Sequence, residues 1–475
     1  MAAQAHGTGT TARRRVLFGL FDGGGWAWAS AKAVFWFVTI VMMLGYIPDR
    51  AYYFTVFPTL DLGVNLFSPI NFCPPSNRNL PCPVPAGGTL PWDPSPSQLA
   101  LPAARTDGAA VQVGTSMVYV GGSDGKAATD STFRAPLFGG TFGPWQAGGT
   151  LPAPRTAAAV VTLNSAIYVA GGNGPDGKPT DTLFVASQDL ATGALSGFTA
   201  SDALKLPAAR SAASLVAAGD GLFLIGGTDG STPQPTVWKS TLDKNGKLGA
   251  WQPQASLPRG VSEAAAAIVG DHLFVYGGRD AQGPEGLVLR GNLGTDPANL
   301  GQIVSWDIGG GATNLPGPRA NAAGFSSNGT LYLVGGRDTQ GLRPELYWAV
   351  PDARGDIAGW RHLPPTDLPT GLSGAAAMVS GSQAFLIGGT IADGAVVGSA
   401  RTNLAPQPPF FQLGLFGATV PALKIGGEIG QQLGYLNAAG AGAVNFIVLI
   451  LIGYAFAHKE RTRAFLHRLR ERRKG

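Results

Sequence analysis

Six Gly-Gly pairs recur along the chain at a nearly constant spacing, and this repeat constrains the fold more than any other feature of the sequence. The pairs stand at 121/122, 171/172, 226/227, 277/278, 335/336 and 388/389, with a mean spacing of about 53 residues. Each pair follows a short apolar run that carries an aromatic residue two or three positions before it. This pattern predicts six buried strands that each end at a turn.

Two further markers repeat in the same register. An aromatic residue recurs at 53, 53, 53, 55 and 54 residue intervals, at Trp92, Trp145, Phe198, Trp251, Trp306 and Trp360. Asp-Gly and Asn-Gly pairs, such as Asp124-Gly125 and Asn245-Gly246, supply the positive φ angles that tight hairpins need. The repeats are therefore predicted to be meanders of short antiparallel strands.

Taken together, these features make the chain resemble the kelch family, whose repeats of about 50 residues each form a four-stranded blade of a β-propeller. The matching features are the Gly-Gly pair after an apolar strand, the spaced tryptophan, and a Leu-Pro-x-x-Arg motif such as 101–105 that opens a repeat. The resemblance covers 92–409 and implies an all-β, six-bladed kelch propeller.

The tryptophan register predicts how the ring closes. In kelch blades this tryptophan lies in the outermost strand, and here Trp92 precedes the first Gly-Gly pair while no equivalent follows the sixth. The strand around Trp92 is therefore expected to complete the sixth blade and to leave no open sheet edge.

Composition excludes several classes of function. The chain has two cysteines and five histidines, which leaves too little material for a zinc cluster, and no cofactor or metal is expected. Between Trp92 and Pro409 there are 19 Lys/Arg against 23 Asp/Glu, so the predicted propeller has no basic character and nucleic acid is not an expected partner. No catalytic constellation is apparent. Asp243-Lys244-Asn245-Gly246 lacks the glutamate that ends a calcium loop and is interpreted as a hairpin turn.

Two sets of repeat positions are candidate ligand contacts. Four arginines stand 16 residues before their Gly-Gly pairs and so occupy equivalent places in the ring: Arg105, Arg155, Arg210 and Arg319. Their guanidinium groups are suited to a carboxylate or an acidic glycan, and the alternative is that each pairs with an acid or a backbone carbonyl of an adjacent blade. Fourteen residues before the pairs the residue varies, and by the kelch resemblance the polar ones, Asp107, Glu263 and Asn321, are candidate rim contacts.

Both ends of the chain carry predicted membrane spans. Residues 26–47 and 438–457 are mostly apolar stretches long enough, as helices, to cross a hydrocarbon core of about 30 Å. Arg13, Arg14 and Arg15 precede the first span and eight basic residues follow the second, so both termini are expected in the cytoplasm and the propeller on the other side. A cleaved signal peptide is the alternative for the first span.

The predicted organisation is accordingly a cytoplasmic segment 1–25, a span 26–47, a linker 48–91, the propeller 92–409, a linker 410–437, a span 438–457 and a basic tail 458–475. The functional hypothesis is a membrane-anchored extracytoplasmic module for protein or glycan recognition, or an assembly subunit of a membrane complex. The alternative is an enzyme acting on acidic sugars, similar to kelch sialic-acid mutarotases, with Asp107 and Glu263 as the acid-base pair.

Cys73 and Cys82 are predicted to form a disulfide, because they are the only cysteines and both fall on the side assigned as extracytoplasmic, where thiols are oxidised. Proline and asparagine between them favour the turn that a bridge needs. Peptide mapping without reductant should recover the two cysteines in one linked fragment. Two separately alkylated cysteines would contradict both the bridge and the assigned topology.

Overall fold

A computed structural model describes residues 87–93, 99–138, 141–189, 194–352, 354–381 and 383–404, together with the strands at 413–415 and 418–420. The chain divides into two compact units, and the unit that holds nearly all of the described residues is the propeller. The strands Leu413–Leu415 (β29) and Ala418–Val420 (β30) form a separate antiparallel pair in the other unit.

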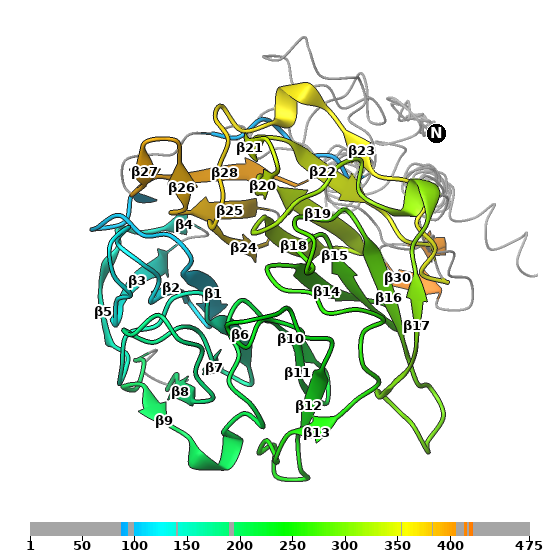
Figure 1. Cartoon of the computed structure of the whole chain (residues 1–475), viewed down its shortest axis with the longest axis horizontal. Helices are drawn as coiled ribbons and strands as arrows, with labels where there is room; N and C mark the ends of the chain where they lie inside the picture. The colour runs from blue at the N-terminus through cyan, green and yellow to red at the C-terminus, as the bar shows by residue number, and fades with distance from the viewer. Residues whose placement is uncertain are drawn as a thin grey trace, which may run out of the picture. The chain divides into compact units, whose positions relative to one another are not determined.

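The propeller consists of six antiparallel sheets arranged around a central axis, with strands β1, β6, β10, β14, β18 and β24 innermost (Figure 1). The predicted all-β, six-bladed fold is confirmed.

Blades 1 to 3 comprise β1 (Ala109–Val113), β2 (Ser116–Val120), β3 (Ser131–Phe138), β4 (Thr141–Phe142) and β5 (Gln146–Thr150); β6 (Ala159–Leu163), β7 (Ala166–Ala170), β8 (Leu183–Ser187) and β9 (Thr199–Ala200); and β10 (Ser214–Ala218), β11 (Gly221–Ile225), β12 (Val237–Thr241) and β13 (Gln252–Pro253).

Blades 4 to 6 comprise β14 (Ala265–Val269), β15 (His272–Tyr276), β16 (Val288–Leu293) and β17 (Ile303–Ile308); β18 (Ala323–Ser327), β19 (Thr330–Val334), β22 (Leu346–Ala349) and β23 (Arg361–His362); and β24 (Ala376–Ser380), β25 (Gln383–Ile387) and β28 (Ser399–Asn403). Small hairpins follow the last two Gly-Gly pairs: β20 (Arg337–Asp338) with β21 (Gly341–Leu342), and β26 (Thr390–Ile391) with β27 (Gly394–Ala395).

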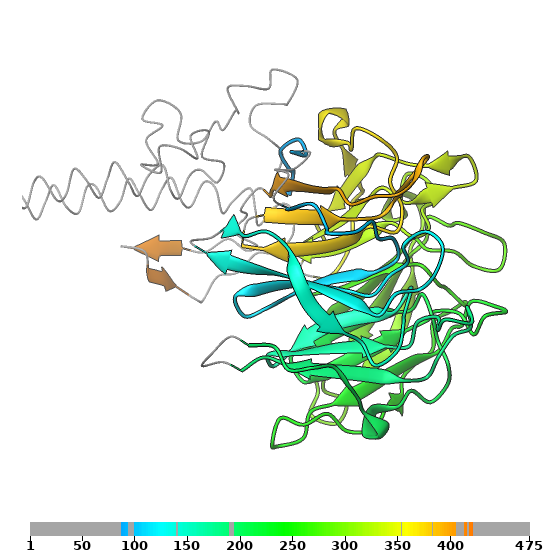
Figure 2. The same ribbon diagram turned by 90° about the vertical axis from the view of Figure 1, so that its left-hand side faces the viewer.

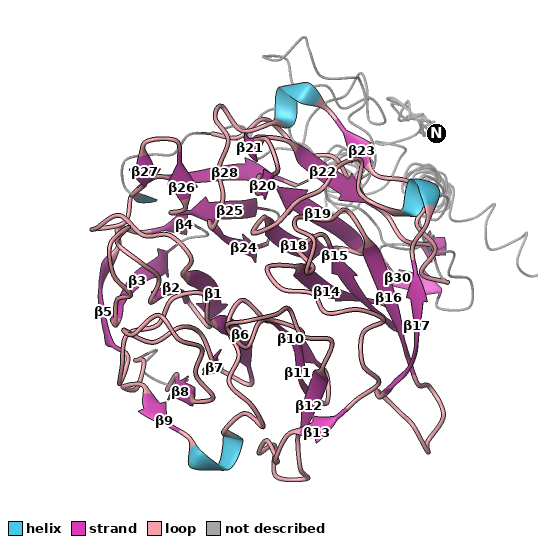
Figure 3. Cartoon of the chain, viewed as in Figure 1, coloured by secondary structure: helices cyan, strands magenta, loops and turns pink. Residues whose placement is uncertain are grey.

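Three short 3-10 turns lie wholly within the described residues, and loops connect them and the strands (Figure 3). The turns span Asp202–Leu204, Gly311–Thr313 and Pro364–Thr366. No helix among the described residues has the length and apolar character needed to cross a membrane. The predicted spans 26–47 and 438–457, and the predicted Cys73–Cys82 bridge, lie outside the described residues.

The Gly-Gly pairs join each blade to the next. In all six pairs both glycines have positive φ, and the N–H of the second glycine donates to a carbonyl that opens the following repeat, as from Gly122 to Arg155 at 2.8 Å. A Cβ built on the first glycine of a pair would meet that same carbonyl oxygen closer than 3.0 Å. The repeated glycines are thus required both by backbone conformation and by close approach of the next blade.

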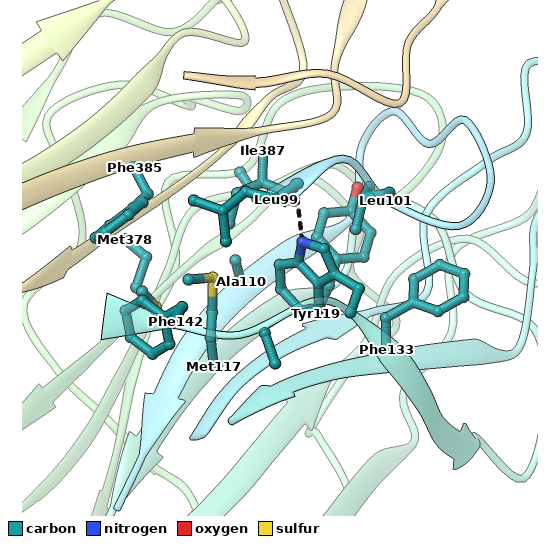
Figure 4. Packing of buried hydrophobic residues seen from close by; sticks show 13 residues of the cluster. Leu99, Leu101, Ala110, Met117, Tyr119, Phe133, Phe142, Met378, Phe385 and Ile387 are labelled. Carbon is teal, nitrogen blue, oxygen red and sulfur yellow. Dashed lines mark hydrogen bonds between the residues drawn. The ribbon is translucent and has the colours of Figure 1, made fainter. Parts of the chain in front are cut away.

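Each junction between neighbouring blades has its own apolar core. Six clusters of buried side chains are present, one for each pair of adjacent blades, including the closing pair. Figure 4 shows the cluster between blades 6 and 1, where Met378, Phe385 and Ile387 of blade 6 face Met117 and Tyr119 of blade 1. The ring is therefore held by six similar interfaces rather than by one central core.

The N-terminal described stretch closes the ring, as the tryptophan register predicted. Thr89 pairs with Leu404, and Asp93 exchanges backbone hydrogen bonds with Arg401 at 2.8 and 3.1 Å, so this stretch is the outer strand of blade 6 (Figures 1 and 2). Trp92 is 6% exposed and packs in the cluster between blades 5 and 6.

Replacing Trp92 by alanine should lower the free energy of unfolding by about 3–5 kcal/mol, because it removes a large buried side chain from the closing interface. Denaturant unfolding of the full chain in detergent measures the change. Val397→Ala is the control, since Val397 is 42% exposed and its truncation should cost less than about 0.5 kcal/mol. Equal stability of the two variants would contradict closure by this strand.

Candidate functional site

The six residues that stand 14 positions before the Gly-Gly pairs meet at one end of the propeller axis. Their backbones form a closed ring in which each N–H donates to the carbonyl of its counterpart in the preceding blade, at 2.8–3.1 Å. The donor-to-acceptor pairs are Asp107 to Gly374, Ala157 to Asp107, Ala212 to Ala157, Glu263 to Ala212, Asn321 to Glu263 and Gly374 to Asn321. The positions selected from the sequence are thus brought together.

All six of these residues adopt a left-handed backbone, with φ between 49° and 65°. Five of them are not glycine, and such a conformation is uncommon for residues with a side chain. Because Ala157 and Ala212 share it with the polar residues, the strained backbone belongs to the ring architecture and does not by itself mark a binding site.

A cavity of about 130 Å³ lies within this ring, and its wall has two unlike halves. Blades 1, 4 and 5 contribute the polar side chains of Asp107, Glu263 and Asn321, whereas blades 2 and 3 contribute only Ala157 and Ala212 at the equivalent positions. We call this cavity, with its ring of six residues, the central mouth.

Asp107 and Asn321 are joined across the central mouth. The Asn321 amide Nδ2 donates to Asp107 Oδ1 at 2.7 Å, although the two residues belong to blades 1 and 5. Gly374 of blade 6 lies between them, and a Cβ there would come to 2.5 Å from Asp107 Oδ1. Glycine at this position is what allows the two side chains to meet.

Glu263 is held by two arginines that the sequence analysis did not select. Arg337 Nη2 donates to Glu263 Oε2 at 2.6 Å, and Arg279 Nη1 lies 3.9 Å from Oε1. The side chains of Arg279 and Arg337 are 45% and 38% exposed. Both arginines directly follow a Gly-Gly pair, where the other repeats have Ser, Asn or Thr, so comparing that position between repeats would have identified them.

The four equivalent arginines are buried and have internal partners. Arg105, Arg155, Arg210 and Arg319 are 4–7% exposed. In each, Nη1 donates to the carbonyl of the preceding residue at 2.7–2.8 Å and Nη2 donates to a side-chain oxygen of the same repeat at 2.6–2.9 Å. Each guanidinium also lies over an aromatic ring of its own blade, with centroid distances of 4.8–5.3 Å.

These contacts agree with a structural role for the four arginines, with one difference from the alternative considered above. The partner oxygens of Ser131, Thr182, Thr236 and Glu345 come from the arginine's own blade and not from an adjacent one. Burial also lowers the pKa of Arg155 and Arg210 from the usual arginine value. A direct ligand contact by these arginines stays a prediction.

The compressed fourth repeat replaces the missing arginine with a different charge cluster. Val261 stands where four of the other five repeats have arginine, and Arg259 instead pairs with Asp280 at 3.2 Å and with Glu285 at 3.3 Å. Burial raises the pKa of Glu285 to about 7, although the charge of Arg259 opposes this shift.

Other polar groups considered in the sequence lie away from the central mouth. Asp243 accepts backbone hydrogen bonds from Asn245 and Lys247, which confirms a turn there. His272 contacts Asn292, and His362 contacts Asp367. In the part of the chain that the structure describes, no group of three or more His, Cys, Asp or Glu side chains is placed to hold a metal ion.

Comparisons with known proteins agree with this architecture. Residues 157–389 match the family model of the KLHDC2/KLHL20/DRC7 Kelch-repeats domain. N-acetylneuraminate epimerase 1 of Escherichia coli O6:H1 strain CFT073 is 35% identical over 85 residues, which span 18% of this chain and 22% of that protein. The solved structure of YjhT has a TM-score of 0.50 and 16% identity, over 63% of this chain and 95% of that chain, and it shows a shared fold.

Arg155→Met should lower the free energy of unfolding by about 2–4 kcal/mol, because it leaves the Thr182 hydroxyl and the Pro154 carbonyl without their buried partner. Arg279→Met, which removes a half-exposed guanidinium beside Glu263, should change the free energy of unfolding by less than about 0.5 kcal/mol. Thermal and denaturant unfolding compare the two. Wild-type stability of the Arg155 variant would show that its buried contacts are not structural.

Proposed function

Since residues 157–389 match a kelch-repeat family model and the described residues between 87 and 404 form a six-bladed propeller, we propose that this chain is a membrane-anchored recognition module that binds its ligand at the central mouth. The observation that carries the proposal is the division of the mouth into a polar arc and an alanine arc. The ring uses only the backbone of the six equivalent positions, so their side chains are free to serve a ligand, and three of the six are charged or amide side chains grouped on one side of the mouth.

The chemistry of the polar arc favours the end of an acidic glycan. Carboxylate, amide and guanidinium groups form planar, paired hydrogen bonds that suit vicinal hydroxyls, and Arg279 offers an exposed cation for a sugar carboxylate. The alanine arc provides an apolar surface for the C–H face of a ring. A cavity of about 130 Å³ is small beside typical ligand sites of about 300–1,000 Å³, so it would receive only part of a terminal sugar and not a folded protein surface.

The membrane anchor is part of the same proposal. It is supported by the apolar stretches 26–47 and 438–457 and by the basic residues that flank them, which favour cytoplasmic termini and an extracytoplasmic propeller. The apolar linkers 48–91 and 410–437 favour contacts with the membrane or with other subunits of a membrane complex.

A second candidate function is an enzyme that acts on acidic sugars. It is favoured by the 85-residue similarity to N-acetylneuraminate epimerase 1 and by the presence of two carboxylates, Asp107 and Glu263, at one mouth. Each carboxylate accepts a hydrogen bond, Asp107 from Asn321 and Glu263 from Arg337, and each keeps further lone pairs that can take up a proton in such an enzyme. The recognition module needs no proton transfer.

The test is to measure the binding of N-acetylneuraminate to the full chain in detergent, by calorimetry or ligand-observed NMR. A neutral hexose serves as the comparison ligand. Arg279→Met and Glu263→Gln should each weaken binding about tenfold or more, because charge-assisted hydrogen bonds contribute about 1.5–3 kcal/mol. Arg354→Met is the matched control, since that arginine is 83% exposed and pairs with Asp352 and Asp356, neither of which belongs to the mouth.

Equal binding by the mouth variants and the control, or no sugar binding at all, would contradict the proposal. Interconversion of the sugar anomers at a rate that depends on Asp107 and Glu263 would favour the enzyme instead. Binding without turnover supports the recognition module.

A further inference from the structure

The outer strand of blade 4 differs from those of the neighbouring blades. β9, β13 and β23 have two residues each, whereas β17 (Ile303–Ile308) has six. The five-residue outer strand of blade 1, β5, is polar and includes two adjacent glycines. Proteins usually keep edge strands short or polar because unpaired backbone groups attract other strands. In blade 4, by contrast, the edge strand β17 is long, and it lies on the perimeter of the propeller (Figure 1).

Part of the β17 backbone faces outward. Gly309 N–H donates to Val288 O at 2.8 Å and Ile308 is opposite Leu289, so the backbone groups of 307 and 309 point toward β16. Because these directions alternate along a strand, the groups of Trp306 and Ile308 point away from it. No described strand pairs with that side of β17. Two donors and two acceptors are therefore presented to a further strand.

Exposed apolar side chains gather on β17 and just before it. Among the described residues only four large hydrophobic side chains are exposed, and three of them lie in 300–308: Leu300 at 65%, Val304 at 50% and Ile308 at 57%. Single exposed hydrophobic residues are ordinary, but a cluster along an edge strand is typical of an interaction surface.

A side-chain cavity lies at the end of this strand. Its volume is about 170 Å³, and Phe274, Val288 and Ile357 supply apolar wall. Asp307 and Asp356 stand at its edge, 49% and 53% exposed, with Arg290 bonded to both at 2.8 and 2.6 Å.

The charge around this cavity is not balanced. Arg354 adds a second cation near Asp356, and it also contacts Asp352. Among the residues that line the cavity, two carboxylates face the single guanidinium of Arg290, which leaves one negative charge; Arg354 and Asp352 do not line the cavity and balance each other. Hydrogen bonds from Asn292 and from Arg290 lower the pKa of Asp307, so this carboxylate stays charged at neutral pH. A cationic side chain with an apolar stem complements both the wall and the charge.

We propose that the outer edge of blade 4 docks an extended segment of a partner protein by strand addition, and that a lysine or arginine of this segment enters the cavity beside Asp307 and Asp356. This surface is separate from the central mouth, so the inference does not depend on the proposed ligand. The backbone of Trp306 and Ile308 provides affinity, and the charged cavity selects the side chain.

The test uses six blocked hexapeptides in which one lysine moves through an alternating Val/Thr sequence, so that the correct register is sampled. Their binding to the full chain in detergent is measured by fluorescence anisotropy. At least one peptide should bind, and replacing its lysine by glutamate should abolish binding. On binding, hydrogen exchange at the Trp306 and Ile308 amides should slow, which a contact through side chains alone would not cause.

Two variants separate the parts of the proposal. The double variant Asp307→Asn with Asp356→Asn should weaken the best peptide at least tenfold, and Ile308→Pro should abolish binding because it removes an outward N–H without breaking a β16 hydrogen bond. Asp202→Asn loses the same kind of charge from an exposed site between blades 2 and 3 and should bind normally. Unfolding midpoints confirm that each variant is folded.

Three outcomes overturn the proposal. The first is that no peptide binds. The second is that the lysine and glutamate peptides bind equally. The third is that the amides of Trp306 and Ile308 are already protected without peptide, either in a monomer or in a self-associated form, since the edge would then be covered by this chain itself.

Discussion

The closed ring of six backbone hydrogen bonds around the propeller axis is the constraint on which the rest of the structure depends. It requires a left-handed residue at the same position of every repeat, and it places that residue's side chain at the central mouth. The second set of inter-blade bonds, from the Gly-Gly pairs, fixes each blade at the distance where its apolar face meets the next one. Architecture and candidate site are therefore built from the same repeat positions, one through the backbone and the other through the side chains.

This division explains why repeat positions that keep the same residue and repeat positions that vary have different roles. An arginine stands 16 residues before the Gly-Gly pair in four of the six repeats, and in these four it is buried and bonded to its own blade. The residue two positions later varies, because only its backbone is needed by the ring. Where it is alanine the mouth is apolar, and where it is Asp107, Glu263 or Asn321 the mouth acquires hydrogen-bonding groups.

Much of the fold was predictable because it follows from spacing. The Gly-Gly pairs predicted six blades, and the register of Trp92 predicted the strand that closes the ring. The three polar mouth residues were also found by position. What spacing did not predict is contact between side chains of different blades: the Asp107–Asn321 hydrogen bond, which requires Gly374 between them, and the Arg337–Glu263 pair. Such contacts depend on how far the blades rotate around the axis, and a one-dimensional repeat carries no information on that rotation.

Closure by the stretch around Trp92 also has a mechanical consequence. Thr89 is paired with Leu404 in an antiparallel bridge, so the chain enters and leaves blade 6 at the same end of one strand pair. A load that draws both connections in one direction puts little shear on the hydrogen bonds between these strands. A load that pulls the connections apart breaks the hydrogen bonds between these strands one after another, beginning at Thr89 and Leu404. The pairing that closes blade 6 therefore resists a load that pulls both connections in the same direction, and it breaks when the two connections are pulled apart.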